Sequence, residues 1–217
     1  MYNTVIFDLD GTLLNTIDDL SDAGNFVCDQ QGWPTFSVDA YKKMVGNGIP
    51  LLVERFSPVD ARTPARLAAT LESFLERYSA HMNDKTAPYP GIPQLLQKLR
   101  DEGLRMAVFS NKKDELSKQV TASYFGDLFH LVRGGRNDTP AKPDPTGVFQ
   151  ILEALGADPK TTLFVGDSNV DILTANNAGL ASCGVLWGFR DAEELKEAGA
   201  TYLASDTDAL YHTILGR

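Results

Sequence analysis

Residues 4–13 of the chain, TVIFDLDGTL, decide its fold. An apolar run that ends in Asp8, Asp10 and Gly11 predicts a buried parallel strand whose carboxyl end opens into a turn, and open α/β sheets place their active sites at that end. An ordinary turn with two solvated acids is one alternative interpretation. A calcium loop is a second, but such a loop needs a third oxygen residue before its glycine, and Gly11 comes too early. We therefore expect Asp8 and Asp10 at the rim of an active site.

The composition of the 217-residue chain is typical of a soluble globular protein. Hydrophobic residues make up 43% of it, which is enough for the core of one large domain or of one domain with an insertion. The net charge of −9 argues against a surface for nucleic acid or anionic membranes, because basic residues do not cluster enough to displace counterions. Residues 1–4 lack the basic and apolar regions of a signal peptide, and no apolar run approaches membrane-spanning length. We expect a cytoplasmic protein.

The two cysteines, Cys28 and Cys183, lie far apart in the sequence, in no CxxC pair and beside no histidine. This arrangement favours buried free thiols over a disulfide or a zinc site. The three histidines are equally scattered, and we assign them no function.

Residues 15–85 contain several helical patterns and no convincing strand. Thr63 and Pro64 are typical of a helix start, and apolar residues follow them at helical spacing. The residues of this stripe are Leu67, Leu71, Phe74, Leu75, Tyr78 and Met82. The stripe indicates the core of a helix bundle. We therefore expect an all-helical cap domain at residues 15–85, inserted into a core that consists of residues 1–14 and 86–217.

After residue 91 the helical and strand patterns alternate, which predicts a parallel sheet. The expected strands cover residues 104–109, 129–132, 162–165, 183–187 and, at one edge of the sheet, 201–204. Together with the first strand they predict an α/β fold, a Rossmann-like parallel sheet with helices between its strands.

Polar side chains follow the ends of three of the predicted strands: Asp8 with Asp10, then Ser110, then Asp167. The carboxyl ends of the strands of a doubly wound sheet meet at one crevice, so these residues are expected to be neighbours. Asp171 lies in the first turn of the next helix, where it either complements the helix dipole or joins the site. Clustered carboxylates repel one another unless a cation compensates, and an all-oxygen set of ligands favours Mg²⁺.

Lys142 lies between Pro140 and Pro143, which restrict the backbone and can aim a long side chain. A solvated surface lysine is the alternative interpretation. An ammonium group at this point could neutralise both the carboxylates and a phosphoryl group. Ser110 and the amide of Asn111, expected at a helix N-terminus, could hold phosphate oxygens.

In this order, the motifs resemble those of the haloacid dehalogenase-like superfamily of phosphatases that form an aspartyl-phosphate. The matching parts are DLDGT at 8–12, Ser110, Lys142 and GDSNVD at 166–171. The resemblance implies that Asp8 is the nucleophile and that Asp10 is the general acid and then the general base. It also implies Mg²⁺ held by Asp8, the Asp10 carbonyl and Asp167, with Asp171 ordering the water ligands.

The same resemblance implies that Ser110 and Lys142 grip the transferring phosphoryl group and that the helical insertion is a mobile cap. We assign Thr12 and Asn111 to substrate binding beside them. These roles suit phosphoryl transfer, in which positioning and charge neutralisation dominate.

Within the superfamily the details are most similar to those of phosphoglycolate phosphatases. The similar parts are VGNG at 45–48, YPG at 89–91, SNK at 110–112 and WGF at 187–189, which pyrophosphatases and other small phosphatases share. The cap loop Gly46-Asn47-Gly48 offers backbone amides and no arginine, and suits a small anionic group such as a carboxylate. We therefore expect 2-phosphoglycolate as the substrate. We expect the protein to be a monomer or a homodimer. Asn15 departs from the pattern, since many relatives carry an acid in the first hinge.

Several alternatives remain within the superfamily, namely a pyrophosphatase, a nucleotidase or a sugar phosphatase. A β-phosphoglucomutase-like isomerase would be expected to carry a cap histidine and an arginine in the cap loop, where this chain has Leu20 and residues 46–48. Dehalogenases and phosphonate-cleaving relatives would lack Asp10. A receiver-type signalling domain also joins a phosphoacceptor aspartate, magnesium and a lysine, but it has no acid two residues later and no helical cap. A phosphatase is the preferred interpretation.

Overall fold

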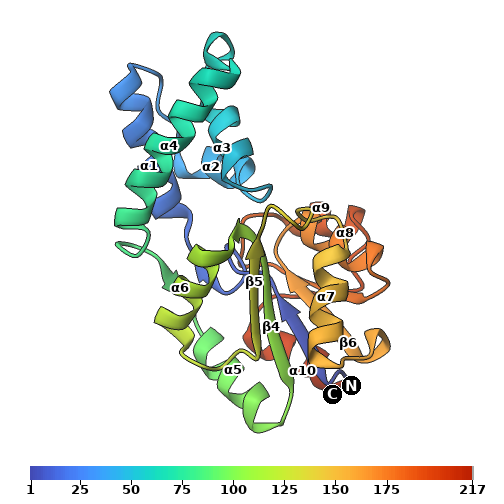
Figure 1. Ribbon diagram of the computed structural model, residues 1–217. Coiled ribbons are helices and arrows are strands. Elements are labelled where there is room, and N and C mark those ends of the chain that lie inside the picture. Colours follow the sequence, from blue (N-terminus) through green and yellow to red (C-terminus); the bar gives the residue numbers. More distant parts are fainter. Residues whose placement is uncertain (217) are drawn as a thin grey trace. The chain divides into compact units, whose positions relative to one another are not determined.

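The computed structural model describes residues 1–216 of the chain. These residues fold into two compact units (Figure 1). The first unit consists of Met1–Asn15 and the residues from Pro88 onward, and the second of Thr16–Ala87. The limits that we expected for the inserted cap, residues 15 and 85, lie within two residues of these.

Six parallel strands form the sheet of the first unit, in the order β5-β4-β1-β6-β7-β8 (Figure 1). They are β1 (Thr4–Phe7), β4 (Arg105–Lys113), β5 (Leu131–Gly135), β6 (Thr162–Gly166), β7 (Ala181–Val185) and β8 (Tyr202–Ala204). β1 pairs with β4 on one side and β6 on the other, so all four of its residues are buried. The predicted α/β fold with a parallel sheet is confirmed, as is the edge strand near residue 201.

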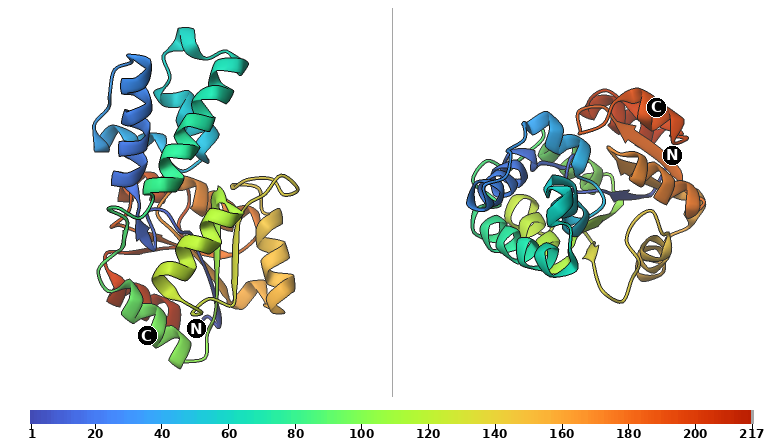
Figure 2. Two further views of the ribbon diagram at one scale, coloured as in Figure 1. Left: turned by 60° about the vertical axis from the view of Figure 1, so that its left-hand side comes forward. Right: turned by 90° about the horizontal axis from the view of Figure 1, so that it is seen from above.

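Helices cover both faces of this sheet (Figure 2). They are α5 (Ile92–Asp101), α6 (Asp114–Phe125), α7 (Thr146–Leu155), α8 (Asn169–Asn177), α9 (Ala192–Glu197) and α10 (Thr207–Leu215). Alternate residues of a strand point to opposite faces, so Val5 and Phe7 pack with apolar side chains of α5, α6 and α10, whereas Ile6 packs with those of α7 and α8. The two cores fix the strands whose ends carry the acids.

β4 extends beyond the strand expected at 104–109. It continues to Lys113, and α6 begins at Asp114, so the expectation that Ser110 and Asn111 lie at a helix N-terminus is wrong. The pairing of β4 with β5 is irregular between Phe109 and Lys113. Irregular pairing of this kind re-aims side chains near active sites. β5 and β7 overlap the expected strands at 129–132 and 183–187, but their first and last residues are shifted by two or three positions.

The second unit consists of helices: α1 (Ile17–Gln31), α2 (Val38–Met44), α3 (Ile49–Phe56), the 3₁₀ turn η1 (Val59–Ala61) and α4 (Pro64–His81). The side chain of Thr63 caps α4 by accepting a hydrogen bond from the amide of Arg66, as the Thr-Pro start predicts. Two short strands, β2 (Leu14–Asn15) and β3 (Ala87–Pro88), pair where the chain passes between the units. Asn15 is therefore a strand residue.

The apolar stripe of α4 is only partly a bundle core. Phe74, Tyr78 and Met82 are buried, but the side chains nearer the start of the helix are half-buried. Leu67 and Leu71 line a shallow groove with residues of the short helix α3. Cys28 and Cys183 are buried free thiols, as predicted. Every helix within residues 1–216 is too short or too polar to span a lipid bilayer.

Candidate active site

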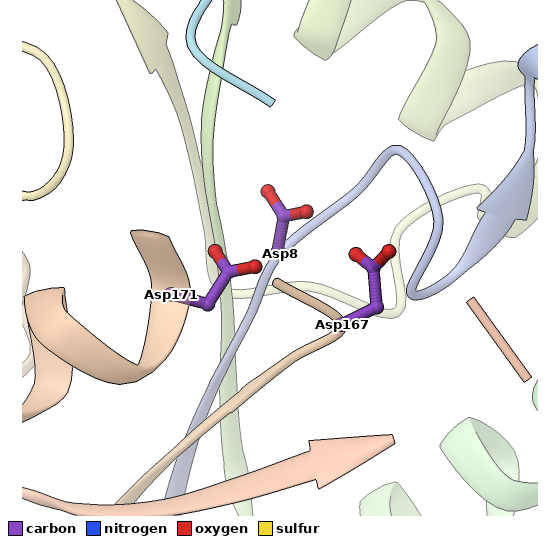
Figure 3. A group of neighbouring side chains, drawn as sticks. All are labelled: Asp8, Asp167 and Asp171. Carbon is purple, nitrogen blue, oxygen red and sulfur yellow. The ribbon is translucent and has the colours of Figure 1, made fainter. Parts of the chain in front are cut away.

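Three buried carboxyl groups meet at the carboxyl end of the sheet (Figure 3). Asp8 follows β1, Asp167 follows β6, and Asp171 lies in the first turn of α8. One oxygen atom from each lies within 4.8 Å of the others. Their exposed fractions are only 6%, 1% and 1%. Asp8 is distant from the other two acids in the sequence but close to them in space, because parallel strands place their carboxyl ends at one edge of the sheet.

Lys142 joins two of these acids. Its Nζ atom donates to Asp8 Oδ1 and to Asp171 Oδ1, both at 2.6 Å, and its side chain is 3% exposed. Asn111 fixes the backbone beside it, because its Oδ1 accepts from the amide of Lys142 at 2.8 Å and its Nδ2 donates to the Lys142 carbonyl at 3.3 Å. The Asn111 side chain thus positions Lys142, and the substrate contact assigned to the Asn111 amide stays a prediction.

The electrostatics of this cluster show an excess of negative charge. Burial and then the neighbouring Asp171 raise the pKa of Asp8 well above its ordinary value, and Lys142 offsets this only in part. Burial and Asp171 also raise the pKa of Asp167 to about 7. Burial alone would lower the pKa of Lys142, but Asp171 and Asp8 outweigh it and raise that pKa. One ammonium group cannot neutralise three carboxylates, so the net negative charge of the cluster favours the binding of a further cation.

Asp167 is held by main-chain and side-chain groups on several sides. Thr12 Oγ1 donates to its Oδ1 at 3.1 Å, and the amide of Phe189 donates to its Oδ2 at 2.8 Å. A Cβ atom at Gly11, where φ is +91°, would lie 2.3 Å from Asp167 Oδ2, and one at Gly188 would lie 2.2 Å from its Cβ. A side chain at either position would displace the carboxyl group. Thr12, assigned to substrate binding, is fully buried and supports Asp167.

The WGF segment at 187–189, for which the sequence suggested no function, contacts Asp167 and the loop after Asp8. Besides the amide of Phe189, the segment provides the indole of Trp187, whose Nε1 donates to the carbonyl of Thr12 at 3.0 Å. One short segment therefore holds both Asp167 and the loop that follows Asp8.

Asp171 fits both interpretations of its position in the sequence. Its Oδ2 accepts from the amide and the hydroxyl of Ser168, at 3.0 and 2.6 Å, as in a capping box at the start of α8. Its Oδ1 accepts from Lys142. The helix start thus aims one oxygen of Asp171 at the other site residues.

The carboxyl group of Asp10 is not a member of this cluster and pairs with a second lysine. Lys112 Nζ donates to Asp10 Oδ1 at 3.1 Å, and the amide of Lys112 donates to Ser110 Oγ at 3.2 Å. Lys112 belongs to the SNK motif at 110–112, but no function was predicted for it. Its signal was the two-residue spacing from Ser110, which puts both side chains on the same face of a strand.

The cap loop of the second unit contains Gly46, Asn47 and Gly48. Arg55 donates to Asn47 Oδ1 at 2.9 Å and to the carbonyl of Met44. The loop itself contains no arginine, as expected, but the connection between α2 and α3 is short enough for the side chain of Arg55 on α3 to reach it. Both glycines have positive φ, 120° and 87°, and Gly48 is the N-cap of α3.

Comparisons with known proteins agree with one another. A model of the haloacid dehalogenase-like hydrolase family matches residues 5–185. A curated phosphoglycolate phosphatase from Psychrobacter arcticus is 30% identical over 219 residues, 97% of this chain and 95% of its own. Another, from Cereibacter sphaeroides, is 36% identical over 192 residues, 87% of each chain. The crystal structure of a protein from Lactobacillus delbrueckii subsp. bulgaricus, provisionally assigned as a phosphoglycolate phosphatase, has a TM-score of 0.94 and 32% identity, covering 100% of this chain and 99% of its own.

Proposed function

Because the chain belongs to the haloacid dehalogenase-like hydrolase family and is a phosphatase, we propose that it hydrolyses 2-phosphoglycolate through an aspartyl-phosphate on Asp8. The observation that carries this proposal is the buried cluster of Asp8, Asp167 and Asp171 with Lys142 at 2.6 Å from two of the acids. A carboxylate beside a buried ammonium group and a cation site is suited to attack a phosphoryl group and to neutralise its charge.

In this proposal the reaction has two steps, formation and hydrolysis of the aspartyl-phosphate. In the first, a carboxylate oxygen of Asp8 attacks phosphorus, the bond from phosphorus to the ester oxygen breaks, and the departing oxygen takes the proton of the Asp10 carboxyl group. In the second, the Asp10 carboxylate takes a proton from a water molecule whose oxygen attacks phosphorus. The bond to Asp8 then breaks, inorganic phosphate leaves, and both acids return to their starting states.

Lys142 and Ser110 hold the transferring group in this scheme. The Lys142 ammonium group already touches Asp8 and can contact a phosphoryl oxygen beside it. Ser110 Oγ accepts from the Lys112 amide, so its hydroxyl proton can be donated to another phosphoryl oxygen.

The donor set fits Mg²⁺, since three buried carboxyl groups with only oxygen donors exceed the charge of one lysine. We assign Asp8, the backbone carbonyl of Asp10 and Asp167 as the protein ligands, and Asp171 as the residue that orders its waters. When bound, the ion supplies positive charge to the phosphoryl oxygens and the carboxylates.

The substrate proposal rests on the curated relatives and on the cap loop. The amides at Gly46, Asn47 and Gly48, together with the guanidinium of Arg55 beside them, suit the carboxylate of a small substrate. We assign the phosphoryl group to the acid cluster and the carboxylate to this loop.

We expect a higher kcat/KM for 2-phosphoglycolate than for pyrophosphate, nucleoside monophosphates or sugar phosphates. Ethyl phosphate is the sharpest control, because it has the same two-carbon frame without the carboxylate. Losing that charged contact should lower kcat/KM by about 10-fold or more, equivalent to about 1.4 kcal/mol. Steady-state phosphate release measures all five classes of compound.

Arg55→Met should narrow the difference between 2-phosphoglycolate and ethyl phosphate, whereas Arg66→Met, at an exposed position of α4, should not. If ethyl phosphate or a compound of another class is the better substrate, the assignment to phosphoglycolate fails and the phosphatase chemistry stands.

A further inference from the structure

Lys112 is a buried cation that the catalytic scheme does not use. Its side chain is 3% exposed, and its Nζ atom lies 3.1 Å from Asp10 Oδ1. The Asp10 side chain is itself only 16% exposed. A lysine is rarely buried unless it is paired, and the partner of Lys112 is Asp10. We therefore ask what Lys112 contributes to the function of Asp10.

The backbone of Lys112 is fixed on three sides. Its amide donates to Ser110 Oγ at 3.2 Å, and its carbonyl accepts from Ser117 Oγ at 3.1 Å. On β5, Gly134 approaches so closely that a Cβ atom there would lie 2.5 Å from the Lys112 carbonyl oxygen. These contacts lie in the irregular part of the β4–β5 pairing. The paired backbone, and not a flexible surface loop, therefore fixes the position from which the Lys112 side chain extends.

The two buried lysines divide the acids between them. Lys142 contacts Asp8 and Asp171, whereas Lys112 contacts Asp10. A buried ion pair is weak evidence for stability, because removing both charges from water offsets most of their attraction. The pair does have a geometric consequence: two acids only two residues apart are held by different cations.

We propose that Lys112 is a positioning residue that holds the Asp10 carboxyl group where it can donate to the leaving oxygen and then accept from water. The inference rests on the proposed acid and base function of Asp10. In Lys112→Met the side chain keeps its approximate length but loses its three N–H donors, so Asp10 is no longer fixed. A misplaced general acid slows a reaction only where the leaving group needs a proton.

The experiment compares two substrates in each variant. The alkoxide of 2-phosphoglycolate needs a proton as it departs, whereas 4-nitrophenyl phosphate releases a stable phenolate that does not. We expect Lys112→Met to lower kcat/KM for 2-phosphoglycolate by about 10- to 100-fold and for 4-nitrophenyl phosphate by about 3-fold or less. Lys112→Arg should restore most of the lost activity. Lys118→Met is the matched control, since Lys118 is an exposed lysine that pairs with Asp114 on α6.

Partial misfolding cannot imitate this result, because the ratio of the two kcat/KM values does not depend on the fraction of active enzyme. Equal losses with both substrates would assign Lys112 to phosphate binding, and no loss with either would make it dispensable. Both outcomes overturn the proposal. Asp10→Asn, measured in parallel, separates the two hypotheses: full activity of that variant refutes the acid and base function itself, whereas an impaired Asp10→Asn with a normal Lys112→Met refutes only the positioning.

Discussion

Asp8→Asn is expected to abolish phosphate release from 2-phosphoglycolate, with a loss of kcat on the order of 10⁴-fold or more. The amide oxygen is a poor nucleophile, so the first step cannot form the aspartyl-phosphate. The change keeps the size of the side chain and removes one of three mutually repelling carboxyl groups, so the variant should fold. Steady-state phosphate release measures the loss, and thermal unfolding checks the fold.

The matched control is Asp60→Asn, which makes the same chemical change at an exposed position in η1. It should retain the activity of the unmodified protein. Near-normal turnover by Asp8→Asn would refute covalent catalysis at this residue.

Removal of divalent metal is expected to lower kcat about as much as Asp8→Asn does. Without a cation, the carboxyl groups of Asp8, Asp167 and Asp171 face a phosphate that is itself an anion, with Lys142 as the buried ammonium group that touches the cluster. Exhaustive chelation should therefore remove nearly all activity, and Mg²⁺ should restore it. Ca²⁺ should inhibit, because its larger and looser coordination shell spoils in-line attack by Asp8.

Binding provides a second readout that does not depend on turnover. Mg²⁺ should raise the unfolding temperature of the metal-free protein, since a ligand that binds the folded state stabilises it and here also reduces repulsion between buried acids. Asp167→Asn should weaken this shift. Full activity after chelation, or no thermal shift with Mg²⁺, would contradict the assigned metal site.

The sequence predicted those parts of the site that follow from local pattern and from a general rule of sheets. Asp8 and Asp167 end apolar strands, and parallel strands bring such ends together whatever lies between them. Asp171 follows from the helix start, where a capping acid can serve a second purpose. The parallel sheet itself required only the alternation of strand and helix patterns after residue 91.

What the sequence did not predict depends on contacts between distant segments. The side chain of Asn111 holds the Lys142 backbone, and Trp187 donates to the Thr12 carbonyl, contacts that no periodicity reveals. Lys112 was missed because the strand was expected to end at residue 109, whereas irregular pairing with β5 carries it to Lys113. The contact of Arg55 with the cap loop depends on the short connection between two helices, which the sequence pattern does not show.

The most direct test of the account is to find the phosphoryl group on the enzyme during turnover. The protein is mixed with 2-phosphoglycolate labelled in its phosphoryl group, quenched rapidly in acid, digested and mapped by mass spectrometry. We expect a label on the peptide that contains residues 4–13, attached to Asp8 as an acyl phosphate that hydroxylamine removes. Steady turnover with no label on the protein, or with the label on a different residue, would contradict it.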